Sequence, residues 1–117
     1  MKTIFIVDDS DTNLAMAEEA LEDYFCTMTL PSAAKMFSLL EKIKPDLILL
    51  DIEMPEMNGF DALERLKAGS FADIPVIFLT GTVDASIEER SSQLGAVGII
   101  TKPFSQEILL NRINSHI

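Results

Sequence analysis

The chain has 117 residues, with 9 Lys and Arg against 19 Asp and Glu, and its formal net charge at pH 7 is −10. This charge argues against a protein that binds nucleic acids or anionic membranes directly, because their phosphates would repel it. Hydrophobic residues make up 48% of the chain. That fraction and the length are enough for a buried core, so we expect one domain spanning residues 1–117.

The sequence lacks the apolar segments of membrane and secreted proteins. No apolar run approaches the roughly 20 residues of a membrane-spanning helix, and the run at 3–7 leads directly into acidic residues, unlike a signal peptide. We therefore expect a cytoplasmic protein. Cys26 is the only cysteine, which excludes an internal disulfide, and we expect it to fill space within a strand. The single histidine, His116, is expected to be solvated.

Short apolar runs rich in branched residues predict the strands. Three of these runs, at 3–7, 47–50 and 76–79, are continuous rather than alternating. Continuous runs are typical of strands buried on both faces of a parallel sheet. Two further candidates, 26–30 and 98–101, are more polar or shorter, so we expect them at the edges of the sheet.

Between the strands, apolar residues recur mostly every three or four positions, which predicts helices. The helical segments are 14–25, 36–43, 60–66 and 104–117, with a weaker one at 84–94. Five strands that alternate with five helices indicate a doubly wound, flavodoxin-like α/β domain. With the weak strands at the edges, right-handed crossovers predict a five-stranded parallel sheet of order 2-1-3-4-5.

The segment 84–94 has a thin apolar stripe. Only Ala85, Ile87 and Leu94 are apolar within it. Docking such a helix gains little, so we expect it to be loosely held and able to move. The pattern taken alone favours a simpler interpretation, in which the segment is a solvated surface helix.

Acidic and polar side chains follow the strands. Asp8 and Asp9 come after the first strand, Asp51 after the third, Thr80 at the end of the fourth and Lys102 after the fifth. Parallel α/β sheets bind ligands beyond the carboxyl ends of their strands, near the point where strand order reverses. Because the predicted order makes the first and third strands neighbours, we expect the three acids to meet in one crevice.

Three neighbouring carboxylates require a positive partner. Each pair of charges repels by roughly 4 kcal/mol at 4 Å and an effective dielectric near 20. Mg²⁺ suits a water-accessible site made of oxygen ligands, and Lys102 supplies a second positive charge. Taken singly, these residues have ordinary explanations as helix caps, a strand-end hydroxyl and a solvated lysine. Their joint placement at four strand ends is not explained in this way.

At these positions the sequence resembles the receiver domain of two-component response regulators, over essentially its whole length. The matching segments are Val7-Asp8-Asp9, Leu50-Asp51-Ile52-Glu53-Met54-Pro55 with Met57-Asn58-Gly59, Leu79-Thr80-Gly81, and Gly95-Ala96 leading to Thr101-Lys102-Pro103-Phe104.

The resemblance implies that Asp51 accepts a phosphoryl group from a sensor histidine kinase or a phosphotransfer protein. It also implies a bound Mg²⁺, held by Asp8, Asp9, one oxygen of Asp51 and the main-chain carbonyl of Glu53. Aspartate is a competent nucleophile towards phosphorus, and positioning with charge stabilisation suffices for such a transfer. The chain would then be a signalling switch that catalyses only its own phosphorylation and dephosphorylation.

The resemblance further implies that Thr80 reports the phosphoryl group, that Lys102 pairs with it, and that the Lys102-Pro103 bond is cis. The hydroxyl of Thr80 would move inward and displace the loop that leads into the segment 84–94. The output surface would comprise that helix, the fifth strand and the last helix, and would control an unknown output partner or domain.

Some positions depart from the family pattern. Three residues before Lys102 the family usually has Tyr or Phe, whereas this chain has Ile99, so we expect switching to depend on the loop 80–84 and the helix that follows it. Val97 and Gly98 are uncharged where many transcription-factor receivers carry acids, which disfavours a charged dimer. Glu53 lies near the route by which water would attack an acyl phosphate, and we expect it to influence the lifetime of that group.

Three other functions fit the sequence less well. Phosphatases of the haloacid dehalogenase type use an aspartyl nucleophile with Mg²⁺, but they place it after the first strand. A flavin binder shares the strand order, but Asp8, Asp9 and Asp11 would repel the flavin phosphate. A scaffold domain that works without phosphorylation is disfavoured by the complete set of acids.

Overall fold

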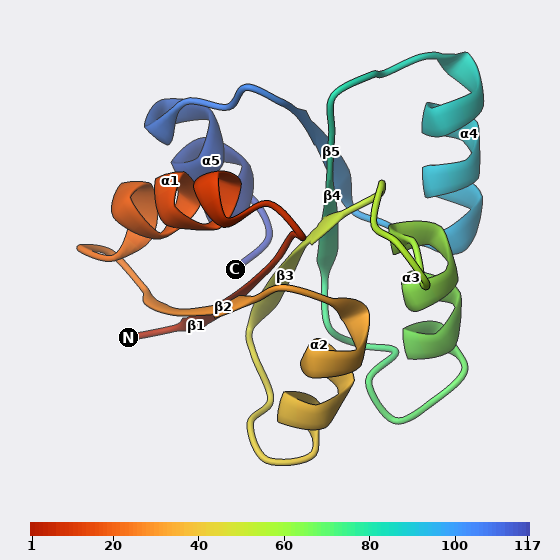
Figure 1. The fold of residues 1–117 in the computed structure, drawn as a ribbon, viewed down its shortest axis with the longest axis horizontal. Helices are drawn as coiled ribbons and strands as arrows, with labels where there is room; N and C mark the ends of the chain where they lie inside the picture. Colours follow the sequence, from red (N-terminus) through yellow and green to blue (C-terminus); the bar gives the residue numbers. More distant parts are fainter.

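Five parallel strands form one sheet in a computed structural model that describes residues 1–117 (Figure 1). The strand order is β2-β1-β3-β4-β5, so the predicted order and the predicted edges are both confirmed. The strands are β1 (Thr3–Val7), β2 (Cys26–Leu30), β3 (Leu47–Asp51), β4 (Val76–Thr80) and β5 (Gly98–Thr101).

The five predicted helices are present, although some end earlier than the apolar pattern indicated. They are α1 (Asp11–Leu21), α2 (Ala33–Leu40), α3 (Gly59–Lys67), α4 (Ala85–Leu94) and α5 (Gln106–Asn114). Each begins after a polar side chain that accepts a hydrogen bond from the backbone N–H of the third helical residue, which satisfies a donor left free at the helix start. These capping residues are Ser10, Ser32, Asn58, Asp84 and Ser105.

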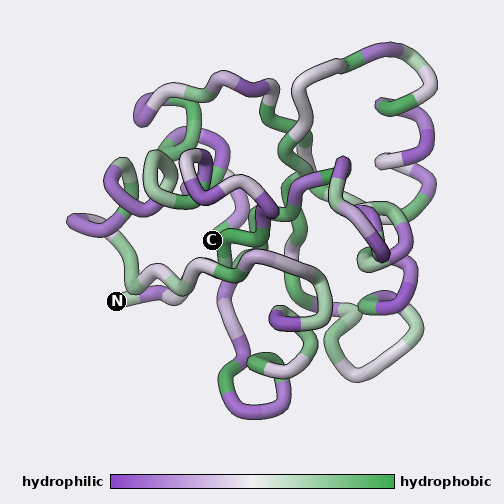
Figure 2. Tube along the Cα trace, viewed as in Figure 1, coloured by the Kyte–Doolittle hydropathy of each residue, from purple (hydrophilic) through white to green (hydrophobic).

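Helices cover both faces of the sheet. In Figure 1, α1 and α5 lie together on one face, while α2, α3 and α4 lie on the other. Successive strand residues point to opposite faces, so Phe5 and Ile48 join the core under α2 and α3, whereas Ile6 and Leu49 join the core under α1 and α5. Figure 2 shows the central strands as the hydrophobic interior. Burial on both faces explains why β1, β3 and β4 are continuous apolar runs.

The edge strands and helix ends contain the sequence predictions that were wrong. Cys26 is exposed rather than a buried filler, because it begins the edge strand β2. Phe25 is buried but follows the end of α1. Ile43 and Ile117 lie beyond the ends of α2 and α5 and are exposed. His116 is solvent-exposed, as expected.

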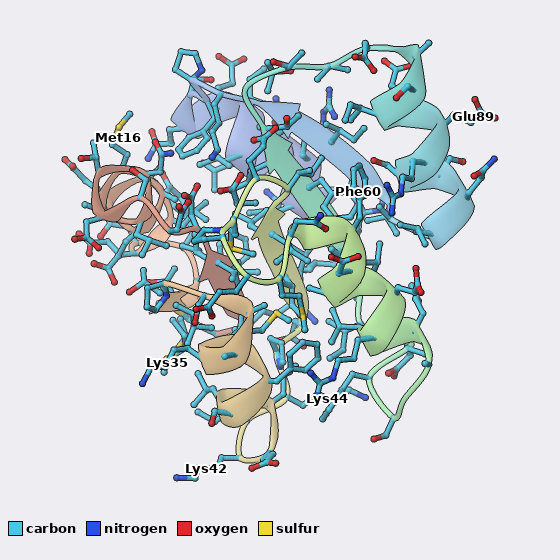
Figure 3. The ribbon with its side chains drawn as sticks, turned by 45° about the vertical axis from the view of Figure 1, so that its right-hand side comes forward. Met16, Lys35, Lys42, Lys44, Phe60 and Glu89 are labelled. Atoms are coloured by element: carbon cyan, nitrogen blue, oxygen red, sulfur yellow. The ribbon has the colours of Figure 1, made fainter.

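Helix α4 is docked shallowly, as its thin apolar stripe predicted. Its only buried residue is Ser91, and it is capped at its C-terminal end by Gly95, which has the left-handed backbone conformation with φ of 91°. The guanidinium of Arg90 lies 4.5 Å from the centre of the Phe60 ring, so a cation–π contact supports the helix. Figure 3 shows Phe60 in the region between α3 and α4, and Glu89 pointing away from the body. None of the five helices has both the length and the apolar character that a membrane span requires.

The start of α3 lies against the end of β3, and Gly59 permits this approach. The N–H of Gly59 donates to the carbonyl oxygen of Ile52 at 2.9 Å. A Cβ at Gly59 would lie 2.5 Å from the carbonyl oxygen of Asp51 and 2.8 Å from the Cα of Ile52. Both neighbours are backbone atoms, so a side chain here would push the helix away from the strand that carries Asp51.

We predict that Gly59→Ala lowers the free energy of unfolding by about 1–3 kcal/mol, the usual cost of overpacking. Urea unfolding followed by circular dichroism measures this change. Gly69→Ala is the matched control, because a Cβ there would have its nearest neighbour, the carbonyl oxygen of Arg65, at 3.8 Å. Equal stability losses in the two variants would contradict the packing argument.

Candidate functional site

Three acids meet at the carboxyl edge of the sheet. One carboxylate oxygen from each of Asp8, Asp9 and Asp51 lies within 4.8 Å of the other two. Asp8 and Asp51 are buried, with 0% and 1% exposure, whereas Asp9 is exposed. The cause is the strand register, because Val7 pairs with Leu50 on the neighbouring strand and the acids follow directly. The prediction that the three acids share one crevice is confirmed.

Hydrogen bonds fix the two buried carboxylates. The backbone N–H of Ser10 donates to Asp8 Oδ1 at 2.9 Å, and that of Glu53 donates to Asp51 Oδ1 at 3.3 Å. The backbone N–H of Asp8 donates to the carbonyl oxygen of Leu30 at 3.1 Å, which continues the pairing of β1 with β2. The acids are therefore held by the turns that leave the strands.

Lys102 lies between the two buried acids. Its Nζ is 2.9 Å from Asp51 Oδ1, to which it donates a hydrogen bond, and 2.9 Å from Asp8 Oδ2. Its backbone N–H donates to the carbonyl oxygen of Thr80 at 2.8 Å, which anchors the turn after β5 beside β4. The Lys102-Pro103 peptide bond is cis, as predicted.

The charges in the crevice do not balance. Burial raises the pKa of Asp51 to about 7, and the neighbouring charge of Asp8 adds to this effect, while the hydrogen bond from Lys102 opposes it. Burial alone would lower the pKa of Lys102, but its contacts with the carboxylates of Asp8 and Asp51 outweigh burial and hold that pKa above its ordinary value. One ammonium therefore faces three carboxylates, and the crevice favours a further positive charge.

The donor set fits a hard divalent cation. All three side chains offer carboxylate oxygens, which Mg²⁺ prefers. Asp8 Oδ2 is buried and accepts no hydrogen bond of good geometry. Its positive neighbour is the ammonium of Lys102, at 2.9 Å. With a divalent ion bound, the total charge of the three carboxylates, Lys102 and the ion would be close to zero. The residues present are therefore suited to holding Mg²⁺.

Thr80 lies at the end of β4 and is fully buried. Its hydroxyl contacts the loop after β3 as well as the loop after β4. Thr80 Oγ1 is 2.7 Å from Glu53 Oε1 and 2.9 Å from the carbonyl oxygen of Thr82, and it accepts a hydrogen bond from the Thr82 N–H at 3.2 Å. A hydroxyl carries one proton, so it donates to only one of the two acceptors at a time.

The side-chain contact between Glu53 and Thr80 was missed in the sequence analysis. The signal that could have revealed it is the register of β3 and β4, in which Asp51 pairs with Leu79. The backbone N–H of Ile52 continues this pairing by donating to the carbonyl oxygen of Leu79 at 3.0 Å. The residues that follow this pair, including Glu53 and Thr80, are therefore neighbours at the ends of β3 and β4.

Comparison with known proteins gives consistent results. Residues 4–114 match the family described as "Response regulator receiver domain". The chain is 38% identical to a probable cyclic di-GMP phosphodiesterase from Vibrio cholerae, over 98% of this chain but only 26% of that protein. It is 34% identical to Protein PilH from Pseudomonas aeruginosa, over 98% of this chain and 97% of that protein.

The fold is likewise similar to solved structures. The chemotaxis protein CheY4 of Vibrio cholerae superposes with a TM-score of 0.95 at 26% sequence identity, covering 100% of this chain and 99% of that one. Family match, fold and strand-end acids therefore agree, and the chain belongs to the response regulator receiver domains, the signalling switches of two-component systems.

Proposed function

We propose that Asp51 accepts a phosphoryl group from a sensor histidine kinase or a phosphotransfer protein in a reaction that requires Mg²⁺. Receiver domains in general interact with histidine kinases and output domains, and phospho-acceptance is general to the family. One observation carries the assignment to Asp51: its buried carboxylate lies at the end of a central strand, 2.9 Å from Lys102 and beside Asp8 and Asp9. Asp8 also contacts Lys102, but β3 lies between β1 and β4 in the sheet, so Asp51 is the acid that lies between the other two acids and Thr80.

The proposed step balances as a group transfer. A carboxylate oxygen of Asp51 forms a bond to phosphorus as the bond between phosphorus and the donor's imidazole nitrogen breaks, and the imidazole leaves with the electron pair. Lys102 lies where it can stabilise negative charge on the transferring phosphoryl group. Asp8, Asp9, Asp51 and the main-chain carbonyl of Glu53 would hold Mg²⁺, which supplies further charge neutralisation when bound.

The phosphoryl group would act on the rest of the molecule through Thr80. Its hydroxyl would turn towards the new phosphoryl oxygens, and the loop 80–84 would carry that movement into α4. The shallow docking of α4, in which only Ser91 is buried, supports this route. A phosphoryl group shifts such an equilibrium only by its differential interaction with the two states.

The proposed output surface comprises α4, β5 and α5. A groove of about 480 Å³ lies on this surface, lined by residues that include Val83, Glu88, Ile99 and Arg112. Arg112 Nη1 donates to the carbonyl oxygen of Ile99 at 2.9 Å, which ties α5 to β5. Because Ile99 has no aromatic ring to swing inward, we propose that the switching movement involves the loop 80–84 and α4, which follows it.

We propose that residues 1–117 form one receiver domain that works in the cytoplasm, where a sensor histidine kinase presents its phosphoryl group. The net charge of −10 supports output through another protein or domain rather than through direct contact with nucleic acid.

Intact-mass analysis after incubation with acetyl phosphate tests the acceptor. We expect the chain to gain the mass of one phosphoryl group in Mg²⁺, to gain none in EDTA, and Asp51→Asn to gain none in either. Asp73→Asn is the control, because Asp73 is an exposed acid paired with Lys44 at 2.9 Å, and it should be phosphorylated like the parent. Phosphorylation of Asp51→Asn to the parental extent would overturn the assignment.

The pKa of Asp51 predicts how stability depends on pH in EDTA. The folded state binds the Asp51 proton more tightly than the unfolded state, because the pKa is raised to about 7. The contribution of this group to stability is therefore fully present below its unfolded pKa and is lost as pH rises through about 7. We expect Asp51→Asn to remove this loss and to be more stable than the parent at pH 8, measured by urea unfolding.

Mg²⁺ should reverse much of this loss in the parent protein. A ligand that binds only the folded state at 100 times its Kd raises the free energy of unfolding by about 2.7 kcal/mol. Thermal unfolding with and without Mg²⁺ at pH 8 measures the gain, and Ca²⁺ at the same ionic strength tests selectivity. A parent protein with the same Tm in Mg²⁺ and in EDTA would count against a metal site at these acids.

A further inference from the structure

We propose that the side chain of Glu53 is a positioning residue that holds the Thr80 hydroxyl in its unphosphorylated arrangement and competes with the phosphoryl group for it. The inference rests on the proposed phosphorylation of Asp51. It is distinct from the expected effect of Glu53 on acyl phosphate lifetime, because it concerns an equilibrium rather than the attack of water.

The contact is short, and one partner is buried. Thr80 Oγ1 lies 2.7 Å from Glu53 Oε1, the shorter of its two distances to possible acceptors. Thr80 is fully buried, whereas Glu53 is exposed at the mouth of the crevice. A hydroxyl that donates to an ionised carboxylate forms a stronger bond than one that donates to a neutral carbonyl, so Glu53 is favoured over the carbonyl oxygen of Thr82.

Glu53 touches both ends of the proposed switch. Its backbone N–H donates to Asp51 Oδ1 at 3.3 Å, while its carboxylate accepts from Thr80. A phosphoryl group on Asp51 would therefore introduce a second anionic acceptor close to the first. Since Thr80 has one hydroxyl proton, bonding to the phosphoryl group requires loss of the bond to Glu53.

The position of the hydroxyl also affects the loop that leads to α4. The backbone N–H of Thr82 donates to Thr80 Oγ1 at 3.2 Å, so this amide changes its surroundings when the hydroxyl turns. Asp84, two residues further on, caps α4, because its Oδ1 accepts a hydrogen bond from the backbone N–H of Ile87 at 2.9 Å. Glu53 thus acts on the start of α4 through Thr80 and sets how readily phosphorylation moves it.

A double-mutant cycle tests whether Glu53 acts through the hydroxyl. The variants are Glu53→Gln, Thr80→Ala and the double substitution, and the probe is beryllium trifluoride with Mg²⁺, a mimic of a phosphoryl group on a carboxylate. Glu53→Gln keeps the size of the side chain but removes its charge. We expect it to tighten probe binding about fivefold to tenfold, the difference between hydrogen bonds to charged and neutral acceptors. In the Thr80→Ala background the same change should alter the affinity less than about twofold.

The outcomes separate the inference from the function on which it rests. Equal tightening in both backgrounds would mean that Glu53 acts by charge repulsion alone, and would overturn the inference. Unchanged affinity in Glu53→Gln would do the same. A parent protein that binds no probe, or binds it as well after Asp51→Asn, would overturn the proposed function instead. Urea unfolding of every variant checks that differences in affinity do not arise from loss of the fold.

A second measurement needs neither Mg²⁺ nor the probe. In the metal-free protein, the amide resonance of Thr82 should shift in Glu53→Gln, because the hydroxyl that accepts from this amide loses its charged partner. Glu56→Gln is the matched control, since it removes the same charge from an exposed residue of the same loop. Equal shifts of the Thr82 amide in the two variants would contradict a specific contact.

Discussion

The repulsion among three carboxylates at one edge of the sheet is the constraint on which the site depends. Asp8, Asp9 and Asp51 converge because β1 and β3 are neighbours at the point where strand order reverses. The core, buried on both faces of the central strands, must hold these charges together against their repulsion and the cost of desolvating Asp8 and Asp51. Lys102 offsets part of that cost, and the remaining negative charge makes the crevice favourable for a cation.

The sequence was informative where one physical effect dominates. Continuous apolar runs arise from burial on both faces, so they predicted β1, β3 and β4, and the strand order then placed Asp8 beside Asp51. Apolar spacing alone does not locate helix ends, and Ile43 and Ile117 lie outside the helices although they continue the apolar pattern. The Glu53–Thr80 contact depends on the register of β3 and β4 and on the side-chain rotamers of both residues, which no periodicity encodes.

The shallow docking of α4 and the identity of residue 99 are related features of the same surface. A helix with Ser91 as its only buried residue gives up little packing when it moves. Ile99 is a branched aliphatic residue on β5, stiff at its first side-chain dihedral, and it has no hydroxyl or ring that could exchange partners with Thr80. The groove beside Ile99 is lined in part by residues of α4 and of the loop that precedes it.

The Thr80 hydroxyl has a single proton, so the states of the proposed switch differ in which acceptor receives its hydrogen bond. Its surroundings offer two acceptors, an anionic one from Glu53 and a neutral one from Thr82, and phosphorylation would add a third that is again anionic. If the only competitor were neutral, a buried hydroxyl would move to a phosphoryl group with little opposition. A charged competitor raises the free energy needed for that move, so the resting state remains well populated until the stronger anion is covalently attached nearby.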